Sequence, residues 1–449
     1  MNTCIDPMCN TFCAGFSAGD ITPAESVPLQ GYGDSKLRMS TNIVSQIYSR
    51  CLAVRDDSGT TALLISIDNA ALTYDICNTI RSMIEKKTGV PAGNIMLSAI
   101  HLHCSPDYDC NEIPSSQRYK TLFINATVQA AVDAIADLAP AEMYIASAET
   151  QNLNFVRNYI CNDGTCAGPN YGSFASGPKD HESKADSTLQ LLKFVRCGKK
   201  DIVIANFQCH PYRGTSGTKT EIHADFIGVF RDTLEKKLDC NTVYFSGASG
   251  NIEPFSLIEA ENITNDMYEQ GKKLAAYALD AEKHYIKIKS GAVRTMVCEN
   301  IYHTDKSQNA LYDRAAEFMR IWQTNGQLAA ADALVNFPEF HSIYHAKYVV
   351  IKHDLPDTRK LPLWVIAFGD VAFTGIPTEI FDTNGMETKA GSPFPITFIA
   401  SLTNGWDGYI PSQLGYTNGG YSTDITRYAQ GTGEQVVQDL LHMLRQLHN

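Results

Sequence analysis

The chain has 449 residues, of which 44% are hydrophobic and 19% are charged, and its formal net charge is -12. This length and apolar content allow a large buried core, and the negative charge argues against nucleic acid or an anionic membrane as the main partner. The longest apolar runs are of strand length. Because about 20 apolar residues are needed to span a bilayer, we expect no membrane insertion.

The N-terminal segment contains neither a basic stretch nor a long apolar stretch, so we expect no secretory signal. The chain has 13 cysteines. An odd number in a large chain without an export signal favours reduced thiols and a cytoplasmic location. Cys161 and Cys166 lie on a polar loop and could clip a metal, but a second thiol pair at the spacing of a structural zinc site is missing.

Strand and helix patterns interleave through the first half of the chain. A turn of aspartate, serine and glycine separates two apolar runs and predicts a hairpin. Strands are expected at 47–55, 61–67, 95–100, 142–150, 189–195 and 202–207. Helices are expected at 74–87, 117–138 and 226–238. The polar stretch 151–184 is longer than an ordinary connection, which favours a functional loop.

The same interleaving continues to the C-terminus. Helices are expected at 262–284, 308–335 and 433–447. Strands are expected at 243–245, 292–302, 343–352, 362–368, 370–374 and 396–402. No linker and no repeat of fixed period interrupts the pattern. The sequence therefore predicts one large α/β domain over 1–449, with a mixed β-sheet core flanked by helices.

Potential metal ligands follow several predicted strands. His101 and His103 come after an apolar run, and the His-x-His spacing puts both imidazoles on one face of an extended chain. His210 follows the run 202–207 in the same way, and Glu379 and Tyr409 follow later runs. Strand ends are where α/β proteins commonly bind ligands, and nitrogen and oxygen donors suit zinc. The alternative is a set of polar residues at unrelated loop mouths.

Other polar residues lie at similar positions but invite a structural interpretation. We expect them to cap helices or to orient ligands rather than to bind metal or substrate. They are Asp20, Asp68, His223 and Asp225.

Seven short motifs, taken in order, resemble the neutral/alkaline non-lysosomal ceramidases. They are AGFSAGDITP with LQGY, SRCLAV with LLISID, SAIHLHCSP, NFQCHP, GNIEP, GIPTE and TNGWDGYIPS. The resemblance covers nearly the whole chain. It implies a ceramidase-like catalytic domain, with the C-terminal β-sandwich domain of the family absent.

The resemblance also implies an assignment of site residues. One zinc ion with an open coordination position is expected on His101, His210, Glu379 and Tyr409. Roles facing the substrate are expected for His103, Tyr421 and Arg157, with Tyr421 near the scissile carbonyl and Arg157 on polar groups of the substrate.

One motif departs from the family pattern. Where the ceramidases carry an essential serine in GDVSP, this chain has Glu253, and Asn251 replaces the aspartate. The serine-dependent mechanism therefore does not transfer to this chain. Glu253 becomes the first candidate for a general base and His103 the second, while Glu253 as a further metal ligand or an ion-pair partner stays open.

These observations favour a zinc-dependent hydrolase that uses a metal-activated water on a carbon–nitrogen, ester or lactone bond of a small soluble substrate. A homo-oligomer is compatible with the sequence. Two alternatives stay open: a metal-dependent lyase or isomerase acting on a polyol or sugar acid, and a non-catalytic metal-binding homologue.

Overall fold

The computed structural model describes residues 11–212, 219–259 and 266–448. Its largest element is a nine-stranded mixed sheet in which one path runs β14-β12-β11-β6-β1-β3-β4-β5, while β16 pairs with β6. The strands are β1 (Cys13–Asp20), β3 (Tyr48–Arg55), β4 (Thr61–Ile67), β5 (Ile95–Ala99), β6 (Ala139–Glu149), β11 (Thr188–Arg196), β12 (Ile202–Phe207), β14 (Asn241–Ser246) and β16 (Ile286–Ile288).

A second, four-stranded sheet packs against the first. Its order is β17 (Val293–His303), β18 (Thr358–Phe368), β19 (Val371–Gly375) and β21 (Ile396–Ala400). Side chains from both sheets, such as Leu52 and Ile204 from one and Ile366 and Phe373 from the other, form one buried cluster. The core is therefore a sandwich of two sheets rather than a single sheet.

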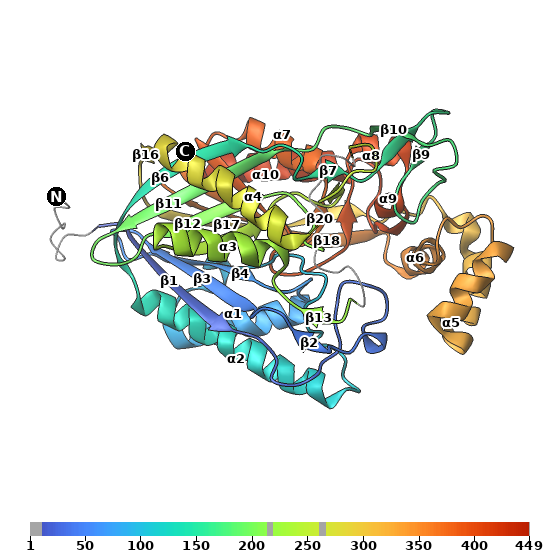
Figure 1. Ribbon diagram of the computed structural model, residues 1–449, viewed down its shortest axis with the longest axis horizontal. Coiled ribbons are helices and arrows are strands. Elements are labelled where there is room, and N and C mark those ends of the chain that lie inside the picture. The colour runs from blue at the N-terminus through green and yellow to red at the C-terminus, as the bar shows by residue number, and fades with distance from the viewer. Residues whose placement is uncertain (1–10, 213–218, 260–265, 449) are drawn as a thin grey trace.

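Helices cover both outer faces of this sandwich (Figure 1). On the large sheet lie α1 (Tyr74–Thr88), α2 (Pro114–Ala136), α3 (Asp225–Leu238) and α4 (Met267–Asp280). On the small sheet lie α7 (Asp382–Gly391) and α10 (Thr432–His448). Residues 51–54 of strand β3 are all apolar because both faces of the strand are buried there. Cys51 and Ala53 face the helices, whereas Leu52 and Val54 face the second sheet, because successive side chains point to opposite faces.

Helices α5 (Tyr312–Ala333) and α6 (Ile343–Asp354) form a pair to one side of the sandwich, at the right of Figure 1. The predicted strand at 343–352 is therefore wrong. Its β-branched and aromatic residues suggested a strand, but Ile343, Ala346 and Val349 are buried at intervals of three, which is helical spacing. The Ser342 side chain also accepts a hydrogen bond from the His345 N–H and begins the helix.

The other predicted elements are found with shifted ends. The predicted helix 262–284 begins at Met267 and continues as a 3-10 turn to His284, and residues 260–265 lie outside the described part of the chain. Helix α5 contains Gly326 at φ 83°, which interrupts it. Three short helices were not predicted: α7, α8 (Gln413–Asn418) and α9 (Tyr421–Ile425). Among the described residues, no helix has the length and apolarity to cross a membrane.

Several of the loops contain short strands that pair with one another. The polar stretch 151–184 contains β7 (Phe155–Val156) and a small sheet of β8 (Tyr159–Cys161), β9 (Cys166–Ala167) and β10 (Pro178–His181). β7 pairs with β15 (Ile252–Glu253), β20 (Glu379–Ile380) pairs with β22 (Tyr409–Ile410), and β2 (Asn42–Ile43) pairs with β13 (Glu221–Ile222).

A candidate metal centre with a buried carboxylate beside it

Two histidines and a glutamate from different parts of the chain meet in the interior. His101 follows β5, His210 follows β12 and Glu379 begins β20. The Oε2 atom of Glu379 lies 3.2 Å from His101 Nε2 and 3.4 Å from His210 Nε2. All three residues are at least 90% buried. The predicted convergence of these strand ends is thus present in the structure.

The outer atoms of these side chains are held by the surrounding protein. His101 Nδ1 lies 2.9 Å from the Ala70 carbonyl oxygen, and His210 Nδ1 lies 2.9 Å from that of Ile252. Because a carbonyl oxygen only accepts, each Nδ1 carries the hydrogen and each Nε2 keeps a lone pair. Trp406 Nε1 donates to Glu379 Oε1 at 3.0 Å, which leaves Oε2 facing the histidines.

The spacing of these donor atoms fits a metal ion. A tetrahedral zinc ion with ligands at about 2.0–2.1 Å separates neighbouring donor atoms by about 3.3 Å, close to the distances between Glu379 and the two imidazoles. Neither His210 Nε2 nor Glu379 Oε2 makes a hydrogen bond among the described residues. Buried lone pairs that face one another repel, and a cation would relieve that repulsion.

His103 offers a further nitrogen to this centre. Its Nε2 lies 3.2 Å from His101 Nε2, and one nitrogen from each of the three imidazoles lies within 4.8 Å of the others. His101 has a positive φ of 67°, a conformation that costs a non-glycine residue about 1–2 kcal/mol. This backbone strain turns the His-x-His segment so that both rings enter the same space.

The pKa values of the histidines and of Glu379 determine the charge of the centre. Burial, followed by the neighbouring His101, lowers the pKa of His210 to about 4, and burial also holds the pKa of His103 well below its usual range. Burial alone would raise the pKa of Glu379, but His101 and His210 bring it well below 4.5. For His101, burial acts to lower the pKa and Glu379 raises it above 6.5. At neutral pH the set therefore combines the neutral imidazoles of His103 and His210 with the Glu379 carboxylate.

Tyr409 lies directly beside Glu379, as its partner in the parallel pair of β20 and β22. Burial, followed by the charge of Glu379, raises the pKa of Tyr409 well above 10. The residue therefore stays a neutral phenol unless a cation draws off its proton. Its predicted role as a metal ligand stays a prediction.

Arg157 and Tyr421 form a polar wall beside Tyr409. The Arg157 guanidinium lies 5.3 Å from the centre of the Tyr409 ring and 5.6 Å from that of Tyr421, within the range of cation–π attraction. Its Nη2 also donates to the Ser422 hydroxyl on α9. Burial acts to lower the pKa of Arg157, but Tyr409 and Glu253 raise it above its usual value. The guanidinium is therefore a fixed positive charge.

Glu253 lies in β15, and only 2% of it is exposed. Burial and then the Glu253 carboxylate hold the pKa of Tyr212 well above 10. The Tyr212 ring centre is 5.3 Å from that of His103 and 5.6 Å from that of His210. Glu253 thus lies close enough to both Arg157 and Tyr212 to raise their pKa values.

The loop that carries Glu253 packs against the strand that carries Glu379. Asn251 Nδ2 donates to Asp382 Oδ1 at 2.7 Å, and the Asp382 N–H donates to Asn251 Oδ1 at 2.9 Å. A Cβ at Gly250 would lie 2.4 Å from the Glu379 carbonyl oxygen. Only glycine allows this approach, so the two acidic residues are held in a fixed relation.

The residues expected to be structural make ordinary structural contacts. Both oxygens of Asp68 bond the Arg231 guanidinium at 2.7 Å, and Asp20 accepts from the Thr22 N–H. His223 Nδ1 accepts from the Asp225 N–H at 3.2 Å. Among the described residues, neither Cys161 nor Cys166 belongs to a group able to hold a metal ion.

Three aromatic residues of the centre were not identified from the sequence. Tyr32, from the LQGY motif, places its ring 4.9 Å from that of His103. Tyr212 follows the CHP motif, and Trp406 orients Glu379. Each lies inside or next to one of the quoted motifs, so the motifs could have identified these three residues.

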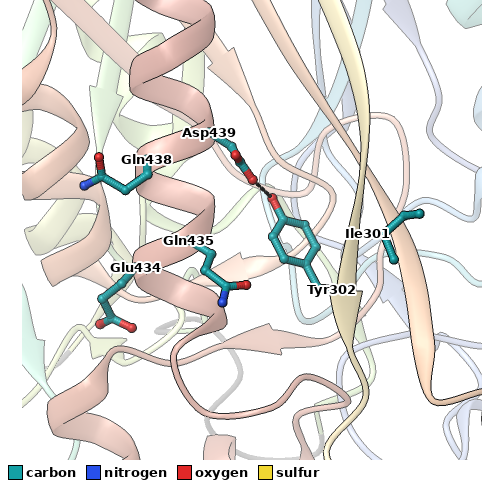
Figure 2. A pocket seen from close by; sticks show the side chains of 6 residues that line it. All are labelled: Ile301, Tyr302, Glu434, Gln435, Gln438 and Asp439. Carbon is teal, nitrogen blue, oxygen red and sulfur yellow. Dashed lines mark hydrogen bonds between the residues drawn. The ribbon is translucent and has the colours of Figure 1, made fainter.

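A separate recess of about 390 Å³ lies between β17 and α10. Figure 2 shows the Tyr302 hydroxyl donating to Asp439 across it, at 2.6 Å. The six residues that line it are Ile301, Tyr302, Glu434, Gln435, Gln438 and Asp439. None of them belongs to the metal centre, and no histidine or cysteine is among them.

A family model and two solved structures give consistent matches to this chain. The family model for neutral/alkaline non-lysosomal ceramidase, N-terminal, matches residues 12–308, and no curated protein sequence matches the chain. A solved structure described as ceramidase complexed with C2 has a TM-score of 0.72 at 15% identity, over 98% of this chain and 75% of that chain. The neutral ceramidase from Pseudomonas aeruginosa gives 0.69 at 16%, over 97% and 74%. At these identities the structures establish the fold, and they confirm the expected mixed helix and sheet domain.

Proposed function

Because the chain belongs to the neutral/alkaline non-lysosomal ceramidase family, we propose that it is a zinc-dependent hydrolase that adds water across an amide, ester or lactone bond of a small substrate. The observation that supports this proposal is that the side chains of His101, His210 and Glu379 lie together in the interior of the protein. These three residues would hold the ion, with Tyr409 or His103 as the fourth donor. Zinc, when bound, would supply a Lewis acid that lowers the pKa of water towards about 7 and polarises the substrate carbonyl.

The neighbouring residues supply the remaining chemistry. The Glu253 carboxylate accepts a proton from the attacking water and passes it to the leaving nitrogen or oxygen, which is general acid–base catalysis. His103, kept neutral by burial, is the second candidate for this proton transfer. The fixed charge of Arg157 and the Tyr421 hydroxyl stabilise the negative charge that develops on the carbonyl oxygen.

The aromatic residues around the centre keep bulk water out and restrict the substrate. Tyr32, Tyr212 and Tyr421 border the imidazoles and Arg157, so the substrate contacts flat apolar faces beside a few polar groups. Such a lining is typical of sites for small organic ligands. The replacement of serine by Glu253 favours a substrate other than ceramide.

The test separates metal binding from turnover. A panel of N-acyl amines, esters and lactones is screened with zinc-loaded enzyme, and Glu253→Gln is then compared with Glu387→Gln, a matched change on the exposed face of α7. We expect both variants to bind zinc as the unaltered protein does. Turnover should fall about 100-fold or more only in Glu253→Gln. Unchanged turnover in that variant would remove Glu253 from the mechanism.

A lyase or isomerase is the second candidate, because Glu253 could also abstract a proton from carbon. Product mass distinguishes the two reactions. Hydrolysis adds one water to the substrate, isomerisation leaves the mass unchanged and elimination lowers the mass of the main product.

A further inference from the structure

A second group of two imidazoles and one carboxylate lies where α6 meets α9. His341 precedes the N-cap of α6, His345 lies in its first turn, and Asp424 lies in α9. One donor atom from each of these residues lies within 4.8 Å of the other two. We propose that His341, His345 and Asp424 form a second metal site, which binds one divalent cation of the zinc class independently of the centre at His101.

The distances within this group suit a cation. Asp424 Oδ2 lies 2.8 Å from His341 Nδ1 and 3.8 Å from His345 Nδ1. These values lie on either side of the donor separation of about 3.3 Å around a tetrahedral zinc ion. Small side-chain shifts would bring both distances to that separation.

The local sequence places both histidines on one side of the helix start. The Ser342 hydroxyl accepts from the His345 N–H at 3.1 Å and fixes the first turn. Residues four apart lie on the same face, and the two imidazole rings are 4.9 Å apart and inclined by 21°. Phe340 packs edge-on against His345, and Tyr171 packs in the same way against His341.

The burial and the hydrogen bonding of His345 favour a role as a metal ligand. Only 1% of it is exposed, and its Nε2 has no hydrogen-bond partner among the described residues. Its Nδ1 accepts the His341 N–H at 3.2 Å, so this nitrogen is unprotonated and keeps a lone pair, 3.8 Å from Asp424 Oδ2. Binding of a cation would replace this hydrogen bond and the 2.8 Å hydrogen bond between His341 Nδ1 and Asp424 Oδ2.

The nearest positive charge does not compete for Asp424. Lys352 Nζ pairs with the Asp305 carboxylate at 2.8 Å and donates only to the main-chain oxygen of Asp424, at 3.2 Å. The carboxylate of Asp424 is therefore left to the two histidines. The side chain of His341 is 41% exposed, which gives a cation a route of entry and leaves space for water ligands.

The donor types select the class of cation. Two imidazoles and one carboxylate suit zinc, cobalt or nickel, whereas calcium and magnesium prefer sites made entirely of oxygen. The first centre uses the same donor types. A chain loaded with zinc should therefore fill both sites.

The position of this group indicates what the cation would do. Helix α6 belongs to the pair that lies beside the sandwich (Figure 1), and α9 carries Tyr421 and Ser422, which contact Arg157. A cation shared by α6 and α9 would fasten the helical pair to the segment that forms the wall of the first centre. The site therefore has a positioning role.

Metal content tests the proposal without any assay of activity. The purified chain is stripped with a chelator, reloaded with Zn²⁺ or Co²⁺, desalted and analysed for bound metal. The variants are His341→Ala, the pair His101→Ala with His210→Ala, the combination of all three changes, and His442→Ala as an exposed control. We expect two ions in the unaltered chain and the control, one in each of the first two variants, and none in the combination.

Because His341 is partly exposed, its replacement should leave the chain folded, which circular dichroism checks. Two ions in His341→Ala, or a single ion in the unaltered chain that only the His101 and His210 changes remove, would overturn the proposal. If bound metal is lost only in the His101 and His210 variant, the second site is refuted while the proposed hydrolase centre is still supported. The two proposals can therefore fail separately. Loading by Mg²⁺ or Ca²⁺ in preference to Zn²⁺ would also contradict it.

Discussion

Glu379 and Tyr409 are directly opposite each other in a parallel pair of two-residue strands, although 29 residues separate them in the chain. The carboxylate and the phenol therefore point to the same side of the pair. Glu379 is also held by Trp406, so three residues from two loops define one corner of the metal centre. This relationship determines what replacement of the phenol should do.

Tyr409→Phe removes only the hydroxyl group. Groups that orient a metal-binding carboxylate commonly change metal affinity 10- to 100-fold, so we expect zinc to bind the centre at His101 about 10-fold more weakly, with the number of ions bound at saturation unchanged. Titration of the stripped protein with zinc in competition with a chromophoric chelator measures the change. An unchanged affinity would show that the phenol contributes to neither ligation nor orientation.

Gly250→Ala should disturb the centre through the main chain. The added methyl group would lie 2.4 Å from the Glu379 carbonyl oxygen, and overpacking of this kind costs about 1–3 kcal/mol. We expect a lower melting temperature and weaker zinc binding, because Glu379 must move. At Gly93 the nearest atom to an added Cβ is 3.8 Å away. Gly93→Ala is therefore the matched control, and equal effects of the two changes would contradict the steric argument.

Asp382 should make stability depend on pH. Burial raises its pKa to about 6 from 3.8, despite the hydrogen bond from Asn251. A carboxyl with a raised pKa stabilises the fold below its unfolded pKa, and that contribution is lost as the pH rises through about 6. The loss amounts to roughly 3 kcal/mol, since each pKa unit corresponds to about 1.4 kcal/mol.

Asp382→Asn should remove this dependence. Relative to the unaltered protein, the free energy of unfolding of the variant should rise by roughly 2.5 kcal/mol between pH 4 and pH 7.5, because part of the effect is already lost at pH 4. Urea unfolding at several pH values measures it, with Asp57→Asn in an exposed turn as the control. A constant difference across this range would show that Asp382 is ionised in the fold at all of these pH values.

Asp68→Asn should lower stability without affecting the metal centre. Asp68 is fully buried and bonds Arg231 through both oxygens, and removal of one partner from a buried pair costs about 3–5 kcal/mol. Denaturant unfolding should show this loss while bound zinc per folded chain stays constant. A loss of bound zinc with unchanged stability would instead place Asp68 in the site.

The sequence predicted the residues of the candidate metal centre best where a histidine closely follows an apolar strand. His101 and His210 have this form, and both lie where the expected convergence requires. The helix α6 was predicted as a strand because its residues 343–351 are rich in β-branched and aromatic side chains, although Ser342 caps its N-terminus. Packing against α5 decides its conformation, and packing partners distant in the chain cannot be identified from local composition.

Long-range pairings account for most of what sequence reasoning missed. The bonds between Asn251 and Asp382 join segments 131 residues apart. The group of His341, His345 and Asp424 requires α6 to lie against α9. Neither arrangement follows from spacing along the chain. The division of the strands between two sheets likewise depends on side chains meeting across the sandwich.

His101 and His210 follow strands of the nine-stranded sheet, whereas Glu379 follows β19 of the four-stranded sheet after three intervening residues. An ion held by all three residues would therefore connect the two halves of the sandwich, that is, its two sheets. A chain in which the halves had formed but not yet docked would offer only part of the donor set. Since metal affinity then includes the energy of docking, the tightness with which zinc is retained would report how completely the halves have come together.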